Sequence, residues 1–205
     1  VRWDTSREAD IEAVDGLIIG GGDDIAPELY QGEWVSTARL DPERDALERR
    51  LVLEALDANK PVLGVCRRAQ MINVARGSSL HHDADAHYVD SPKVRTILPS
   101  KTLTIIEGTL LARCAGPQPR RVNALHTQTV DRLADGLRVS AVDQGQLVQA
   151  IERTTDPLVI GVQWHPEHLF YARRQRALFR APATAAWANR IGAFQIAHAK
   201  RDALG

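Results

Sequence analysis

Three short apolar segments, each followed by residues that can carry chemistry, constrain the fold of this chain most strongly. They cover residues 14–19, 61–65 and 158–162. Each reads as a buried strand, because it is an apolar run bounded by turn or helix signals. Helical patterns lie between these strands, and such alternation favours a parallel sheet with helices on its faces. The sequence therefore predicts an α/β fold.

The helix between the first two strands has clear start and stop signals. Asp41 can cap its N-terminus, and Pro42 suits the first helical position because its ring presets φ. Asn59 and Pro61 end the helix. Apolar residues recur at helical spacing and predict the side that faces the core. These residues are Leu47, Leu51, Ala55 and Leu56.

The rest of the chain predicts further helices and an antiparallel addition to the sheet. A helix is expected over residues 68–75, closed by Gly77, and the clearest helical pattern near the C-terminus covers residues 183–199. Between them lie short strand candidates joined by turns. These are residues 94–98, 103–106, 121–123, 137–142 and 147–151. We therefore expect a mostly parallel sheet flanked by helices, with a small antiparallel β addition.

Composition excludes several classes of protein. Lys plus Arg and Asp plus Glu number 26 each, so no basic excess points to nucleic acid. The apolar runs are far too short to span a bilayer, and the first residues do not form a signal peptide. Two cysteines cannot form a disulfide scaffold. We expect one cytoplasmic domain over residues 1–205, with no nucleic-acid and no membrane partner.

Cys66 is the first candidate catalytic residue. It follows a buried strand directly and precedes a helix, as in the nucleophile elbow of hydrolases. A helix N-terminus favours the thiolate, and the amide of Arg67 would face a carbonyl under attack. The alternative is an ordinary core thiol, since cysteine is often simply buried. Cys114 lacks this context, and we interpret it as structural or incidental.

His165 and Glu167 are the second candidate pair. A thiolate mechanism needs a base that later protonates the leaving amine, and that histidine needs a partner to orient it. Pro166 stiffens the link between the two residues. A solvated loop is the alternative, and His168 is a rival base. We prefer His165 because it lies at the end of the predicted strand over residues 158–162.

All of these candidates follow the C-terminal ends of predicted strands. Gly20–Gly22 form a glycine turn after the first strand, Cys66 follows the second, and His165 with Glu167 follows the last. In open α/β sheets, ligands bind at this edge. The sequence thus predicts one site built from three separate segments.

The same segments resemble a known family. Residues 64–70, GVCRRAQ, resemble the G-x-C-x-G-x-Q nucleophile motif of class I glutamine amidotransferases, and residues 162–167, VQWHPE, resemble their Q-x-H-P-E motif. Residues 17–24 and 122–128 look like the glycine-rich oxyanion loop and the histidine loop of the γ-glutamyl-γ-aminobutyrate hydrolase branch, also called peptidase C26. The resemblance extends from about residue 14 to about residue 179.

This resemblance implies a flavodoxin-like α/β core and a cysteine-dependent reaction. Cys66 would attack the γ-carbonyl of a γ-glutamyl amide and form a thioester. His165 would protonate the departing amine and then activate water, and Glu167 would orient His165. The amides of Arg67 and of Gly21 or Gly22 would form the oxyanion hole.

The resemblance also implies a small-molecule substrate. Gln70 and Arg67 would help to bind the γ-glutamyl end, and His126 would line the side of the leaving group. No metal and no organic cofactor is expected.

Three features depart from the family pattern. Arg68 stands where the motif has glycine, which brings bulk and positive charge next to the thiol. Thr127 follows His126 where the branch commonly has a second histidine. The chain also begins about forty residues later than family members, judged by normal βαβ size. Either a fragment of a longer chain or a homodimer that covers the unpaired strand edge would explain this start.

Other functions stay open on the sequence alone. A catalytically degenerate or regulatory protein on the same fold would show the same altered elbow. A glutaminase subunit of a synthase, or a cysteine hydrolase acting on esters or peptides, are further alternatives. The arginines at 173, 174, 176 and 180 could bind an anion, but a solvated helix face is the favoured interpretation at zero net charge.

Overall fold

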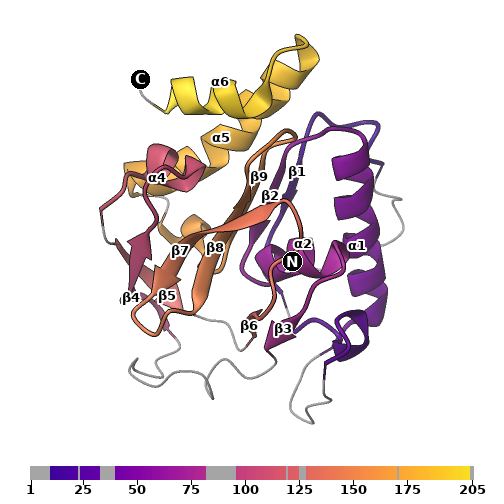
Figure 1. Ribbon diagram of the computed structural model, residues 1–205, viewed down its shortest axis with the longest axis vertical. Helices are drawn as coiled ribbons and strands as arrows, with labels where there is room; N and C mark the ends of the chain where they lie inside the picture. Colours follow the sequence, from indigo (N-terminus) through magenta and orange to yellow (C-terminus); the bar gives the residue numbers. More distant parts are fainter. Residues whose placement is uncertain are drawn as a thin grey trace.

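A seven-stranded mixed sheet forms the centre of the part of the chain that the structure describes. The structure is a computed structural model, and it describes residues 10–22, 24–32, 40–81, 96–118, 120–124, 128–169 and 171–203. The strand order is β1-β2-β9-β8-β7-β4-β5 (Figure 1). The strands are β1 Leu17–Ile19, β2 Val62–Val65, β4 Thr96–Ile105, β5 Arg120–Ala124, β7 Leu137–Asp143, β8 Val148–Arg153 and β9 Val159–Val162.

The first three strands of this order are parallel and the other pairings are antiparallel. β1 pairs with β2 and β2 with β9 in parallel, whereas β8, β7, β4 and β5 continue the sheet in antiparallel fashion. The α/β class is confirmed. The antiparallel strands β5, β7 and β8 overlap predicted segments, but the predicted strand over residues 103–106 is part of a longer one, because β4 extends from Thr96 to Ile105. A separate short ribbon joins β3 Leu80–His81 to β6 Thr129–Val130.

Helices cover both faces of the sheet. Along β2, Val62 belongs to one buried cluster and Leu63 to the other, as the alternation of side chains in a strand requires. The cluster of Val62 includes residues of α1 Pro42–Asp57 and α2 Arg67–Ala75. The cluster of Leu63 includes residues of α4 Leu110–Ala115, α5 Arg173–Arg190 and α6 Gln195–Asp202. Figure 1 shows α1 on one side of the sheet and α5 on the other.

Helix ends follow local chemistry. The Asp41 side chain accepts a hydrogen bond from the amide of Arg44 at 3.1 Å, and Pro42 occupies the first turn of α1, as predicted. The single helix predicted over residues 183–199 is wrong: α5 and α6 are separate helices. Gly192 lies between them with φ of 67°, a left-handed conformation that glycine adopts without strain and that ends a helix.

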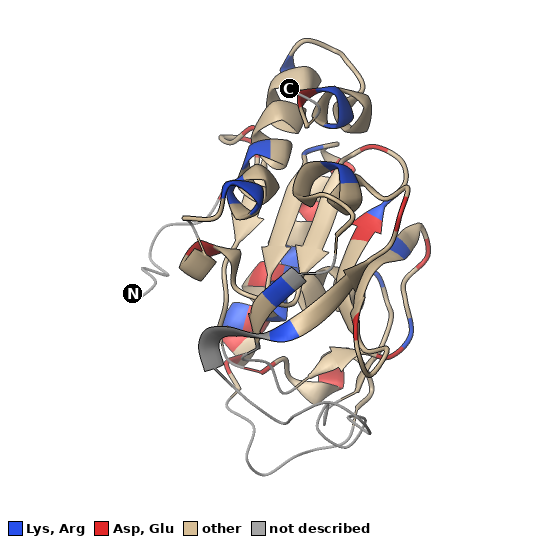
Figure 2. Ribbon diagram, turned by 90° about the vertical axis from the view of Figure 1, so that its left-hand side faces the viewer, with Lys and Arg blue, Asp and Glu red and all other residues tan. Residues whose placement is uncertain are grey.

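Two short 3₁₀ helices, η1 Pro27–Leu29 and η2 Pro166–Leu169, complete the elements. Basic and acidic residues are both spread over the molecule, with several Lys and Arg residues along the C-terminal helices (Figure 2). Among the described residues, no helix has the length and apolar character needed to cross a membrane.

Candidate active site

The carboxyl ends of β1, β2 and β9 bring the candidate residues to one edge. In the register, Ile19 pairs with Gly64, and Val65 pairs with Val162, so the residues after these strands are neighbours. Cys66 follows β2 directly, and His165 lies a few residues past the end of β9. The convergence expected from the sequence is therefore observed for these segments.

Cys66 occupies a sharp strand-to-helix turn. Its φ of 57° and ψ of −118° are unusual for a residue with a side chain. The Cys66 amide donates to the carbonyl of Val162 at 2.7 Å, which ties the turn to β9, and the residue is the N-cap of α2. Strain of this kind is retained where a surrounding fold over-determines it, as at a nucleophile elbow.

Close packing of α2 on the sheet holds this turn in place. A Cβ at Gly64 would lie 2.6 Å from the carbonyl oxygen of Arg68, and one at Gly161 would lie 2.9 Å from the Cβ of Ala69. Side chains at either position would push the helix away from β2 and β9. The close packing of α2 after the nucleophile turn thus depends on the two glycines in the strands beneath the helix.

His165 links Cys66 to Glu167. His165 Nδ1 lies 2.6 Å from Glu167 Oε1, and a hydrogen bond joins the His165 and Cys66 side chains. Burial lowers the pKa of His165, but the hydrogen bonds and charges of Cys66 and Glu167 outweigh burial and raise the pKa to about 10. Glu167 shows the converse. Burial raises its pKa, but the hydrogen bond to His165 and the other favourable interactions outweigh burial, so the pKa of Glu167 is lowered. The three residues thus form the chain of contacts that a catalytic triad requires.

Asn123 fixes the backbone of His165. The amide of His165 donates to Asn123 Oδ1 at 2.8 Å, and Asn123 Nδ2 donates to the His165 carbonyl at 3.3 Å. The side chain of Asn123 is buried at the end of β5. In the sequence Asn123 belongs only to the segment that resembles the family's histidine loop, and no local pattern reveals its role, because the contact joins segments more than forty residues apart.

The rival base His168 stacks on His165, with ring centroids 5.2 Å apart and planes 11° apart. His165, Glu167 and His168 also offer ligand atoms within 4.8 Å of one another, a spacing that could hold a metal ion. However, Nδ1 of His165 bonds to Glu167, and the other ring nitrogen is left for Cys66. The arrangement favours acid–base use of His165.

The glycine turn after β1 packs against these residues. A Cβ at Gly21 would lie 2.6 Å from His165 Cε1, so only glycine lets the backbone approach the imidazole this closely. Arg44 donates to the carbonyl of Gly21 at 3.2 Å. The Gly21–Gly22 backbone therefore lies beside the proposed reacting groups, where oxyanion donors are needed.

Comparison with known proteins decides the family. A sequence model of peptidase C26 matches residues 3–167, most of the chain. The chain belongs to the peptidase C26 family. This membership, together with the relatives below, supports a glutamine-amidotransferase-like hydrolase.

Several curated proteins are similar to this peptidase C26 chain. One is a Mycobacterium tuberculosis protein named as an assumed glutamine amidotransferase. It is 39% identical over 77% of this chain and 52% of its own length. Protein NtpR of Enterococcus hirae is 36% identical over 79% of this chain and 70% of its own. The γ-glutamyl-γ-aminobutyrate hydrolase of Escherichia coli K12 is 33% identical over 75% of this chain and 64% of its own length. The chain thus spans between 52% and 70% of the length of these relatives.

Solved structures agree on the fold. A Thermoplasma acidophilum protein, described as an assumed component of a GMP synthase, aligns with a TM-score of 0.64 at 19% identity, covering 88% of this chain and 76% of that one. A glutamine amidotransferase from Methylobacillus flagellatus aligns with a TM-score of 0.53 at 19% identity. The alignment covers 78% of this chain and 54% of that one. At these identities the likeness shows the fold alone.

Two of the predicted substrate contacts of this peptidase C26 member lie inside the protein. The Arg67 side chain is buried and pairs with Asp45 and Glu48. Gln70 is also buried, and its Nε2 donates to the carbonyl of Gln128 at 2.6 Å and to Gln163 Oε1 at 3.2 Å. Arg67 therefore cannot present its guanidinium to a γ-glutamyl group in this arrangement. A contact of Gln70 with substrate stays a prediction, and His126 lies outside the described residues.

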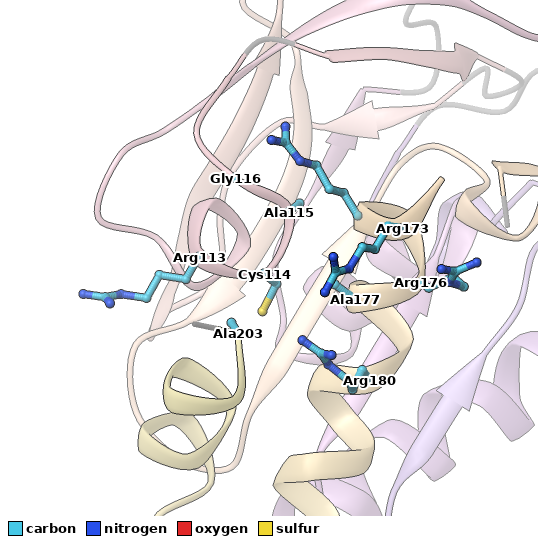
Figure 3. Close-up of a pocket in the computed structure, with 10 residues that line it drawn as sticks. Arg113, Cys114, Ala115, Gly116, Arg173, Arg176, Ala177, Arg180 and Ala203 are labelled. Carbon is cyan, nitrogen blue, oxygen red and sulfur yellow. The ribbon is translucent and has the colours of Figure 1, made fainter. Parts of the chain in front are cut away.

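A cavity of about 560 Å³ lies away from these groups, between α4, α5 and the end of α6 (Figure 3). Arg113, Arg173, Arg174, Arg176 and Arg180 line it together with Cys114. Figure 3 shows the Arg113 side chain pointing away from Cys114, and Arg180 pairs with Asp202 at 2.9 Å. Burial raises the pKa of Cys114 to about 12, so this thiol stays protonated at neutral pH and fits a structural role.

Proposed function

We propose that this chain hydrolyses the γ-glutamyl amide bond of a γ-glutamyl amine through a thioester on Cys66. The observation that carries the proposal is the contact chain from Cys66 through His165 to Glu167 at a strained elbow. The family and the named activity of the Escherichia coli relative support the substrate class.

In the first half of the reaction, the Cys66 sulfur attacks the γ-carbonyl carbon and a C–S bond forms. The carbonyl oxygen takes negative charge in the tetrahedral intermediate. Backbone amides of Arg67 and of Gly21 or Gly22 are the proposed donors to this oxygen. The C–N bond then breaks, and His165 gives its proton to the departing amine nitrogen.

In the second half, His165 takes a proton from water, and the resulting hydroxide oxygen attacks the thioester carbon. The C–S bond breaks and glutamate leaves. The raised pKa of His165 keeps the ring protonated at neutral pH before the first step, which suits an acid that must protonate an amine. Glu167 holds the ring in the orientation that both steps need.

The test is release of glutamate from γ-glutamyl-γ-aminobutyrate, with glutamine and other γ-glutamyl amines in parallel. Cys66→Ala should abolish turnover, and Cys114→Ala, which removes the other thiol, should retain it. Turnover that survives in Cys66→Ala would refute the mechanism. If the folded wild type turns over no substrate of this class, the proposed activity is wrong and a degenerate or regulatory role replaces it.

A further inference from the structure

Arg68, the residue that replaces the motif glycine, is fully buried, and the charge of Cys66 is the weakest of the effects on its pKa. Its guanidinium forms an ion pair with Glu48 of helix α1. Burial lowers the pKa of Arg68, but the charge of Glu48 and its hydrogen bond oppose that effect. The side chain therefore spans from the start of α2, directly after the nucleophile, to α1.

Glu48 is shared by more than one cation. Arg44 Nε lies 2.8 Å from Glu48 Oε1, Arg67 lies 2.5 Å from Glu48 Oε2, and Arg68 binds Oε1 as well. Arg67 also binds Asp45. This cluster thus holds three guanidinium groups and two carboxylates, and the carboxylate of Glu48 joins both helices.

The cluster also contacts the glycine turn. A Cβ at Gly22 would clash with Nη1 of Arg68 and would lie 2.9 Å from Nη1 of Arg44. Arg44 Nη2 donates to the carbonyl of Gly21, whose other side lies against the imidazole of His165. The Gly21–Gly22 backbone is therefore held between two arginines bound to Glu48 and the catalytic histidine.

Stability alone is a weak explanation for this arrangement. Removing charges from water is costly for each ion and is offset only by excellent pairing, so buried ion pairs often add little net stability. Nε and Nη1 of Arg68 are buried and form no hydrogen bond within the described part of the chain. Position, by contrast, matters greatly at an oxyanion hole, because a displacement of about 1 Å can cost roughly 10²-fold in rate.

The geometry points to Arg68 as a positioning residue that, through Glu48 and together with Arg44, holds the Gly21–Gly22 backbone in place to receive the oxyanion. The inference rests on the proposed function for its kinetic consequence, but the positioning itself can be measured without turnover. The substitution of the motif glycine is then a working part of this site and no sign of decay.

The test compares Arg68→Gly, Arg68→Lys and Glu48→Gln with the wild type. Arg50→Ala is the matched control, because Arg50 lies on α1, the helix of Glu48, in an exposed pair with Glu54 at 3.0 Å. For Arg68→Gly and Glu48→Gln, kcat should fall about 10- to 100-fold with little change in KM. Arg68→Lys should recover part of that loss, since it keeps a cation near Glu48. Unchanged kcat in Arg68→Gly would overturn the inference.

Two further readouts separate this inference from the proposed function. Hydrogen exchange of peptides covering residues 20–22 should be faster in Arg68→Gly and Glu48→Gln and unchanged in Arg50→Ala. Alkylation of Cys66 by iodoacetamide forms no oxyanion, so in Glu48→Gln, which keeps the charge of Arg68, its rate should stay within about two-fold if only the turn has moved. An alkylation rate that falls with kcat would show that the elbow itself is disturbed and would refute the positioning role. If no γ-glutamyl amide is turned over, the proposed function fails. The hydrogen-exchange result alone then decides whether Arg68 positions the Gly21–Gly22 backbone.

Discussion

Asn123 bonds to both backbone polar groups of His165, accepting from its amide at 2.8 Å and donating to its carbonyl at 3.3 Å. His165, which follows strand β9 in the chain, is therefore also anchored to the end of β5. This anchor connects the antiparallel part of the sheet to the parallel part that carries Cys66.

Asn123→Ala should lower kcat about 10- to 100-fold, because the imidazole would lose its fixed distance from Cys66. The free energy of unfolding should fall by about 1–3 kcal/mol, since buried partners are left unpaired. Steady-state kinetics and urea unfolding measure the two effects. Asn189→Ala, which removes an exposed bond to Asn59 from within helix α5, is the control for loss of an asparagine. Wild-type kcat in Asn123→Ala would show that His165 needs no such anchor.

Gly21→Ala should impair catalysis strongly, because the added Cβ would lie 2.6 Å from His165 Cε1. Either the turn or the imidazole must move, and we expect kcat to fall about 10²-fold. Gly20→Ala is a close control, since a Cβ there meets nothing within 4 Å. Equal kcat values for the two variants would contradict the close approach of Gly21 to the imidazole.

The two thiols should differ sharply in reactivity. Burial raises the pKa of Cys114 to about 12, so almost no thiolate forms there at pH 8. Cys66 lies at a helix N-terminus and bonds to His165. Mass spectrometry after limited iodoacetamide treatment should therefore find one label, on Cys66, and His165→Ala should slow that labelling. Labelling of Cys114 at the same rate would contradict the assignment.

The pH dependence of Glu167→Gln tests the cause of the raised pKa of His165. In the wild type this pKa is about 10, held up by Cys66 and Glu167 against the effect of burial. Loss of the Glu167 charge weakens that support, so His165 should release its proton at lower pH. The alkaline limb of the kcat/KM profile should then move to lower pH, and NMR titration of the ring should show the same shift. If the alkaline limb does not move, its pKa belongs to a group other than His165.

Local chemistry let the sequence determine much of this protein. Asp41 and Pro42 mark the start of α1 because capping depends on adjacent residues. The apolar runs mark β2 and β9, and the residues directly after parallel strands must share one edge. Cys66 and His165 could therefore be paired before any distance was known.

Tertiary structure alone decided where long side chains go and how far the sheet extends. The sequence places a positive charge after the thiol but does not reveal that the Arg68 guanidinium pairs with Glu48, because a flexible arginine is placed by partners distant in sequence. The anchoring of His165 by Asn123, the unbroken β4 and the separation of α5 from α6 likewise depend on contacts between remote segments or on one glycine conformation. Such contacts leave no periodic pattern in a single sequence, since periodicity reports only which face of an element is buried.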